Sequence, residues 1–396
     1  MKTIGTISRG IKTPLFKAGD PLPEMVADSL LAAAEEGRFE FHDRDVVAMT
    51  EAIVARTQGN YATLDQLAAD VRQKFGPDAH IGLVFPILSR NRFSMILKGI
   101  ARGAKKLTIQ LSYPKDEVGN PLVSQDLLDD AGIDPFRDAF TEAQFRKVFP
   151  DIRHPFTGMD YIQLFKEMAG AECECEIVLS NRLDTILDYT PLVIAADIHT
   201  RKRTRRILLQ KGAKKVLGLD ELLDAPVDGS GYNEQYGVLG SNLATDNSIK
   251  LFPRDCQPIV DKLQRILLER TGKHIEVMVY GDGAFKDPVG GIWELADPVV
   301  SPAYTPGLAG KPNEIKLKYL VDNQLGDLRG DDAKRRMQEL IRQKKADLVA
   351  DMSSQGTTPR RLVDLLGSLC DLTSGSGDKG TPVILVQNYF DNYATD

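Results

Sequence analysis

The sequence predicts an α/β to α+β protein, in which a mixed-sheet core is divided by an inserted segment of parallel, wound sheet. Apolar runs of strand length alternate with helical segments between residues 81 and 223, which is typical of a parallel sheet. The region after residue 236 instead mixes strand runs with amphipathic helices. With 396 residues, 42% of them hydrophobic, the chain can bury a core large enough for two domains.

The first part of the core, residues 1–80, begins with a short strand-like segment. An amphipathic helix is expected over residues 22–36, and Pro23 is compatible with it because proline is tolerated in a first helical turn. A buried strand element follows from Val46, and the apolar residues Ile53 and Val54 continue it. Gln58, Gly59 and Asn60 end this element.

Residues 81–235 are interpreted as an inserted, Rossmann-like α/β subdomain. Its expected strands are IGLVFP, KLTIQLSY, ECEIVLS, PLVIAADI and KKVLGLD, with helices near residues 93–102 and 160–168. A basic helix, HTRKRTRRILLQKG, follows Asp197. Its charges occupy several faces, which favours a solvated helix, although an anion or phosphate subsite near His199 and Thr200 is the alternative.

Residues 236–396 are predicted to complete the core. Helices are expected near residues 257–270, 333–345 and 359–369. The expected strands are HIEVMVYG, ADLVADM and the final run TPVILVQN. A segment rich in glycine and proline, residues 281–310, separates the first of these strands from the second helix.

Charge and cysteine content limit the class of partner. The chain has 50 Lys and Arg residues and 56 Asp and Glu residues, and the resulting net charge of -6 argues against nucleic acid or an acidic membrane as partner. The four cysteines lack the spacing of a zinc site and are expected to be reduced. Neither a signal peptide nor a long apolar run is present, so we expect a cytoplasmic protein that binds a small charged metabolite.

Three polar loops carry the candidate ligands. Asp282 follows an apolar strand and precedes glycines, which suits Mg²⁺ and phosphate, or equally a tight Asp-Gly hairpin turn. The loop from Leu372 to Gly380 offers backbone N–H groups, hydroxyls and Lys379 to phosphates, or is a flexible linker. Asn242 and Asp246 could reach a metal or a ribose, or form an Asx turn.

Other common chemistries lack their motifs. No Gly-x-Ser-x-Gly elbow indicates a serine nucleophile, and no Gly-x-Gly-x-x-Gly follows a strand to indicate a dinucleotide cofactor. The five histidines form no metal-ligand pattern with the cysteines.

Five weak motifs occur in an order that resembles the coenzyme F-420:gamma-glutamyl ligase family. They are GIKTPLFKAGDPL, DVVAMTEAIVARTQGN, GSNLATDNSIKLFP, VMVYGDGAFKDPVGG and GSGDKGTPVILV. The resemblance covers roughly residues 1–75 and 237–390. It implies a ligase core, residues 1–80 plus 236–396, that is split by the insertion at 81–235.

The resemblance also implies the reaction and its residues. A carboxylate acceptor would take the γ-phosphoryl group of GTP or ATP, with Mg²⁺ or Mn²⁺, and the acyl phosphate would then react with the amine of L-glutamate. Family members form homodimers. The implied catalytic residues are Asp282, Arg56 and Lys379, and the implied metal ligands are Asn242, Asp282 and Asp378. The implied nucleotide-binding residues are Thr13, Pro14, Thr50, Glu51, Arg56, Thr245, Gly375, Ser376, Gly377, Lys379 and Gly380.

Departures from the family pattern favour an alternative. Ser241 and Asn242 stand where the family has an aspartate, and Ser376 stands where it has an acidic ligand. A nucleotide-binding regulatory protein that has lost ligase activity is therefore the second hypothesis. A third places the substrate site in the insertion, around His199 and Arg201.

Overall fold

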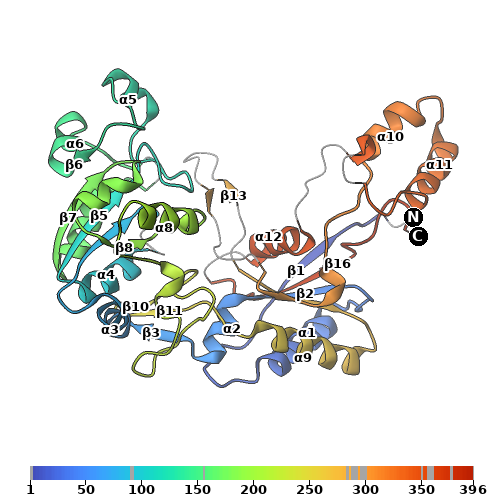
Figure 1. Ribbon diagram of the computed structural model, residues 1–396. Coiled ribbons are helices and arrows are strands. Elements are labelled where there is room, and N and C mark those ends of the chain that lie inside the picture. Colours follow the sequence, from blue (N-terminus) through green and yellow to red (C-terminus); the bar gives the residue numbers. More distant parts are fainter. Residues whose placement is uncertain are drawn as a thin grey trace.

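The computed structural model describes residues 3–89, 93–154, 157–281, 301–348, 351–354, 361–374 and 378–395, and the backbone of 285–286 and 293–294. The chain has the predicted mixed α/β architecture. A mixed sheet forms the base in Figure 1, a six-stranded sheet rises on the left, and the helices α10 (Leu317–Gln324) and α11 (Gly330–Arg342) form the arm on the right.

The base sheet has five strands in the order β1, β16, β2, β12 and β15. These are Ile7–Ile11, Val383–Gln387, Val46–Thr50, Glu276–Tyr280 and Ala303–Tyr304. Strands β2 and β12 run parallel, and the other neighbours are antiparallel. The central strands are buried on both faces, which explains why their sequences are continuous apolar runs.

Helices cover both faces of the base sheet. The amphipathic helices α1 (Leu22–Gly37) and α9 (Cys256–Thr271) pack side by side on one face, where Val26, Val260 and Val47 share a core. Helix α12 (Leu362–Ser374) covers the other face through Leu366 and Cys370. The base sheet is therefore buried between two helical layers.

The expected continuation of the strand through Ile53 is wrong. Strand β2 ends at Thr50, and Glu51–Gln58 form helix α2. The Thr50 hydroxyl accepts a hydrogen bond from the Ala52 N–H, so a threonine and an acidic residue begin the helix, as caps commonly do. Ile53 still packs in the base core because one face of α2 points inward.

The six-stranded sheet lies in the order β6, β7, β5, β4, β8 and β9. These are Phe140–Thr141, Glu174–Leu179, Lys106–Leu111, His80–Val84, Leu192–Ala195 and Lys215–Gly218. All neighbours are parallel except β6 with β7. Across the sheet, the five parallel strands lie in the order β7, β5, β4, β8 and β9. Numbered by their position along the chain, this order is 3-2-1-4-5, which is that of a Rossmann-like sheet.

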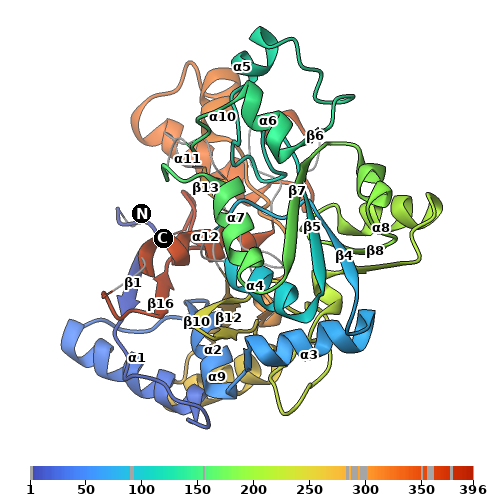
Figure 2. The same cartoon turned by 90° about the vertical axis from the view of Figure 1, so that its left-hand side faces the viewer.

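Helices lie on both faces of this sheet as well. Helices α4 (Ser94–Gly103) and α7 (Tyr161–Gly170) share one core with it, and α3 (Leu64–Phe75) packs on α4. Figure 2 shows α8 (Arg201–Gln210) on the opposite side of the sheet from α4 and α7. Leu67 of α3 and Ile249 contribute to this core from outside the predicted insertion, whose boundaries stay a prediction.

A small sheet lies between the two large ones. Its strands are β10 (Asn242–Thr245), β11 (Ser248–Lys250) and β3 (Tyr61–Thr63), all antiparallel. Strands β13 (Phe285–Lys286) and β14 (Trp293–Glu294) pair separately. The remaining short elements are α5 (Gln125–Asp130), α6 (Glu142–Val148), η1 (Leu183–Asp188), η2 (Leu219–Glu221), η3 (Pro306–Leu308) and η4 (Met352–Ser354).

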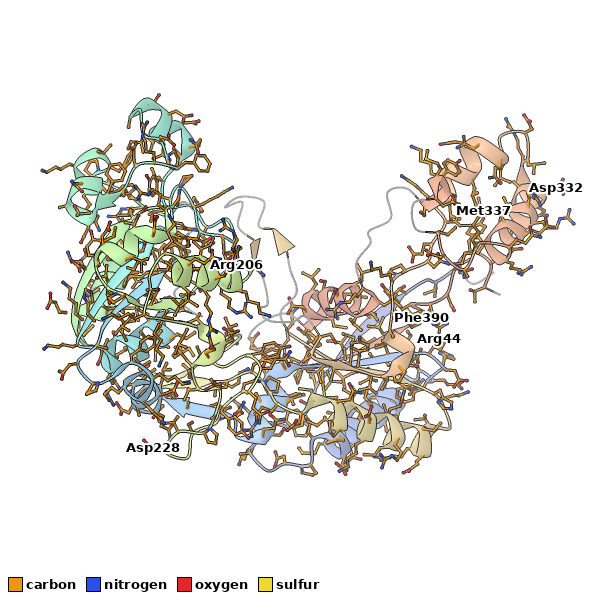
Figure 3. The ribbon with its side chains drawn as sticks, viewed as in Figure 1. Arg44, Arg206, Asp228, Asp332, Met337 and Phe390 are labelled. Atoms are coloured by element: carbon orange, nitrogen blue, oxygen red, sulfur yellow. The ribbon has the colours of Figure 1, made fainter. Side chains whose placement is uncertain are left out.

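The α10–α11 arm has its own small core, in which Met337 packs with Leu320, Leu325 and Ile341 (Figure 3). The predicted strand ADLVADM is not found over its described residues 346–348 and 351–352, where a 3-10 turn begins instead at Met352. No helix in the described part of the chain is long and apolar enough to cross a membrane.

Candidate active site

Four chain segments meet at one edge of the base sheet, which we call the carboxyl edge. Strand register sets this convergence: Ile11 lies beside Val383, Val383 beside Met49, and Thr50 beside Tyr280. Strands β1, β2 and β12 therefore end at the edge where β16 begins. Carboxyl ends of parallel strands are where α/β sheets usually bind ligands.

The opening loop and the last loop border this edge. Thr13 and Pro14 follow β1, and the Thr13 hydroxyl donates to the Pro14 carbonyl oxygen over 3.1 Å. Asp378 and Lys379 form an exposed turn ahead of β16, and Gly380 has a φ of +67°, which favours glycine. These predicted ligand residues lie in loops that flank two neighbouring strands, β1 and β16.

Thr50 and Glu51 lie at the end of β2. The Thr50 N–H donates to the carbonyl oxygen of Pro382 over 3.0 Å, which fixes the end of the last loop to the carboxyl edge. The Glu51 carboxylate forms an ion pair with Lys250 of β11, 3.1 Å away. Only 7% of the Glu51 side chain and 12% of the Lys250 side chain are exposed, so the pair is nearly buried.

The Lys250 contact also brings Asn242 toward the site, because Asn242 lies opposite Lys250 in the β10–β11 hairpin. Thr245 lies at the other end of that hairpin, where its hydroxyl is 2.6 Å from that of Ser248. The adjoining Asn247 accepts a hydrogen bond from Arg102 of α4. The structure thus brings Asn242 near Glu51, whereas Thr245 lies at the turn of the hairpin, where Asn247 contacts α4.

Arg56 is exposed in the last turn of α2. Five helical positions separate it from Glu51, which rotates the two side chains roughly 140° apart. Arg56 therefore does not share the face that carries the Glu51–Lys250 pair.

Two buried side chains, Tyr280 and Cys256, have raised pKa values to which the Glu51 charge contributes. Tyr280, the last residue of β12, is 1% exposed, and burial raises its pKa above the usual range, with a smaller contribution from the Glu51 charge. Burial likewise raises the pKa of the Cys256 thiol to about 12, and Glu51 adds to this shift. Both groups are therefore neutral near pH 7.

Four predicted ligands lie outside the described residues: Asp282, Gly375, Ser376 and Gly377. Asp282 directly follows the buried Gly281. Within the described residues, no three His, Cys, Asp or Glu side chains form a metal cluster. The described donors at the edge are the carboxylates of Glu51 and Asp378 and the Asn242 amide, and such oxygen ligands suit Mg²⁺ when substrate phosphates complete its shell.

Sequence reasoning missed Lys250 and Tyr280. A charged residue within the apolar run SIKLF, and a tyrosine immediately before Gly281, were the available signals. Neither signal identifies the partner, because Lys250 and Glu51 are far apart along the chain.

The alternative phosphate subsite at the start of α8 is filled by a side chain of the protein. The Glu117 carboxylate accepts hydrogen bonds from the Ile198 and His199 N–H groups, the latter 3.3 Å from each oxygen. The Thr200 hydroxyl lies 3.5 Å from Glu117. This carboxylate occupies the position where a phosphate would accept the same hydrogen bonds.

Comparisons with known proteins identify the family. No curated protein sequence matches the chain. The family model described as F420-0:Gamma-glutamyl ligase matches residues 10–388, which include every segment that meets at this edge. The chain therefore belongs to the F420-0:gamma-glutamyl ligase family.

Proposed function

We propose that this glutamate ligase uses GTP or ATP, with Mg²⁺ or Mn²⁺, to join L-glutamate to a carboxylate acceptor, F420-0 or a similar small acid. The observation that carries the proposal is the convergence at the carboxyl edge. Segments from residues 11–14, 50–51 and 378–382 are widely separated in sequence and lie at the ends of adjacent strands.

In this proposal the last loop binds the triphosphate. Lys379 supplies a cation at an exposed turn, and the backbone N–H groups of residues 375–380 supply further donors. Thr13 and Thr50 offer hydroxyl groups at the same edge. Arg56, in the last turn of α2, and Thr245, at the turn of the β10–β11 hairpin, would contact parts of the nucleotide that lie away from Glu51.

Asn242, Asp378 and Asp282 are proposed to hold the metal. A bound divalent ion would neutralise the charge of the triphosphate. Lys250 keeps the Glu51 carboxylate paired, which fixes the start of α2 and so the position of Thr50. The neutral Tyr280 and Cys256 leave this side of the edge without added negative charge.

The proposed chemistry has two steps. An acceptor carboxylate oxygen attacks the γ-phosphorus, and the nucleoside diphosphate leaves. The amine of L-glutamate then attacks the acyl carbon, inorganic phosphate leaves, and the amine loses a proton to give the amide. The homodimer and the cytoplasmic location stay predictions.

Thermal unfolding with GTP, ATP and GDP, each with and without Mn²⁺, tests nucleotide binding. A ligand at a hundred times its dissociation constant adds about 2.7 kcal/mol to stability, which is readily measured. Phosphate release that requires both F420-0 and L-glutamate then tests the reaction. A metal-dependent shift without such release would favour the regulatory protein, and no shift with any nucleotide would contradict both.

A further inference from the structure

A polar cavity of about 170 Å³ lies beside the carboxyl edge. Three segments line it: the connection at residues 232–236, residues 253–256 that lead into α9, and Pro302. Its volume is close to that of an engineered cavity that holds benzene. The polar lining, however, suits a charged or zwitterionic ligand.

The cavity adjoins the proposed reaction centre. Val279 pairs with Ala303, so by continuing this antiparallel register Pro302 lies opposite Tyr280, the last residue of β12. On the other side, the lining includes Cys256, the first residue of α9. A molecule in the cavity would therefore lie next to the end of β12, where Tyr280 pairs with Thr50, the last residue of β2.

Arg254 is the cation of this cavity. Its guanidinium lies 3.9 Å from the centre of the Tyr232 ring, a cation–π contact that holds the side chain in place. No carboxylate in the described part of the chain pairs with it. Its main chain is fixed separately, since the Arg254 N–H donates to Gln58 over 3.0 Å and its carbonyl oxygen accepts from the Gln58 amide.

One wall of the cavity is rigid. Asn233 is 4% exposed, and its amide nitrogen donates to the carbonyl oxygens of Phe252 and Pro253 at 3.1 and 3.2 Å. Its side-chain oxygen accepts from the N–H groups of Gln235 and Tyr236 at 3.1 and 2.9 Å. All of these bonds are satisfied internally, so Asn233 shapes the cavity and leaves Arg254 to bind the ligand.

Two acidic residues complete the lining. Glu234 and Asp255 are exposed and line the cavity together with Arg254. One cation and two carboxylates in a small polar space complement an α-amino acid, whose carboxylate and ammonium group carry the opposite charges. Arginine recognises a carboxylate through two parallel hydrogen bonds, which a lysine cannot reproduce.

We propose that this cavity is the subsite for the amino-acid substrate, and that Arg254 binds a carboxylate of L-glutamate there. The inference rests on the proposed function, since the amine must lie beside the carboxyl edge when the acyl phosphate forms. Glu234 and Asp255 hold the ammonium group before it loses its proton. Arg254 is thus assigned as a specificity-determining residue.

Direct binding tests the subsite without turnover. Equilibrium dialysis with radiolabelled L-glutamate is made on the full chain, with and without a non-hydrolysable GTP or ATP analogue and Mn²⁺. Saturable binding is expected for the wild type, at least roughly tenfold weaker for Arg254→Gln, and intermediate for Arg254→Lys. Arg265→Gln is the matched control, because Arg265 is an exposed arginine of α9, the helix that begins two residues after Arg254.

Kinetics supply the second readout. Arg254→Gln is expected to raise the KM for L-glutamate at least roughly tenfold while the KM for the nucleotide changes less than about twofold. Circular dichroism confirms folding, which should be retained because the bonds between Arg254 and Gln58 involve only the Arg254 main chain.

The two proposals fail differently. If the wild type binds no L-glutamate, or if Arg254→Gln binds it as well as Arg265→Gln does, the subsite is wrong. A loss of nucleotide affinity in Arg254→Gln with glutamate affinity unchanged would also overturn it, and would make the cavity a nucleotide subsite. If L-glutamate binds through Arg254 but no acceptor-dependent phosphate is released, the subsite stands and the proposed function fails.

Discussion

Glu51 and Lys250 form a nearly buried ion pair, 3.1 Å between Oε2 and Nζ, that joins the base sheet to the small three-stranded sheet. Glu51 begins helix α2 at the carboxyl edge, whereas Lys250 lies on β11 opposite Asn242. The pair therefore links the position of the predicted metal-ligand loop to the end of β2.

Lys250→Met is expected to lower the free energy of unfolding by about 3 kcal/mol, because it leaves the Glu51 carboxylate buried without its partner. Urea unfolding measures the change. The double variant Glu51→Leu with Lys250→Met should cost less than Lys250→Met alone, since no unpaired charge remains.

Lys262→Met is the matched control. Lys262 also forms an ion pair, with Glu24 at 2.6 Å, but 49% and 42% of the two side chains are exposed. Exposed pairs contribute about 0 to 1 kcal/mol, so little change is expected. Equal effects of Lys250→Met and Lys262→Met would show that burial of the Glu51 pair does not matter.

Sequence patterns predicted the parallel strands well for a physical reason. Strands β4, β5, β7, β8 and β9 coincide with the expected apolar runs, because strands buried on both faces need continuous apolar sequence. The pattern failed at Thr50, where an apolar run crosses from a strand into a helix. Ile53 is buried in either structure, so its burial could not distinguish them.

The site was harder to predict because it depends on tertiary contacts. Lys379 carries a local signal of a ligand loop, whereas Thr50 and Glu51 were implied only by the family resemblance; the structure brings their segments together. Lys250 carries no such signal, since its role depends on a partner about two hundred positions away. The orientation of Arg56 likewise follows from the helix that sequence reasoning missed.

Lys379→Ala is expected to weaken nucleotide binding about tenfold, because it removes one charge-assisted contact to phosphate. Stability without ligand should not change, since Lys379 is exposed. Titration calorimetry with GTP and ATP measures the affinity. Lys214→Ala, an exposed lysine on the six-stranded sheet's side of the molecule, is the control, and an equal loss there would contradict a specific role for Lys379.

Stability at alkaline pH is expected to depend on Tyr113. Burial, and then the charges of Asp138 and Asp134, raise its pKa to about 12. In the unfolded chain the value is about 10, so above that pH the native state binds more protons. The contribution of protonated Tyr113 to stability is therefore fully present below pH 10. The free energy of unfolding then falls by about 2 to 3 kcal/mol as the pH rises to 12.

Tyr113→Phe tests this expectation. The variant loses the hydrogen bond to the Asp138 carbonyl oxygen and about 1 kcal/mol at pH 7, but should lose less stability between pH 10 and 12 than the wild type. Urea unfolding at each pH measures both effects. Tyr61→Phe is the control, and an alkaline slope that Tyr113→Phe leaves unchanged would contradict the assignment.

Gly10 is expected to be required for the approach of β1 to the last loop. An added Cβ would lie 2.9 Å from the Thr381 Cβ, too close for any rotation of the threonine to relieve. Gly10→Ala should therefore cost about 1 to 3 kcal/mol by overpacking. It should also weaken nucleotide binding, because Thr381 follows Gly380 in the loop proposed to bind phosphates.

Adding Thr381→Gly removes the clashing atoms, so the cost of Gly10→Ala should largely disappear in that background. Gly5→Ala, where an added Cβ meets nothing within 4 Å, is the control for the glycine change itself. If Gly10→Ala costs as much with Thr381→Gly as without it, the two segments do not meet as closely as the structure indicates, and the convergence at the carboxyl edge loses its support on the β1 side.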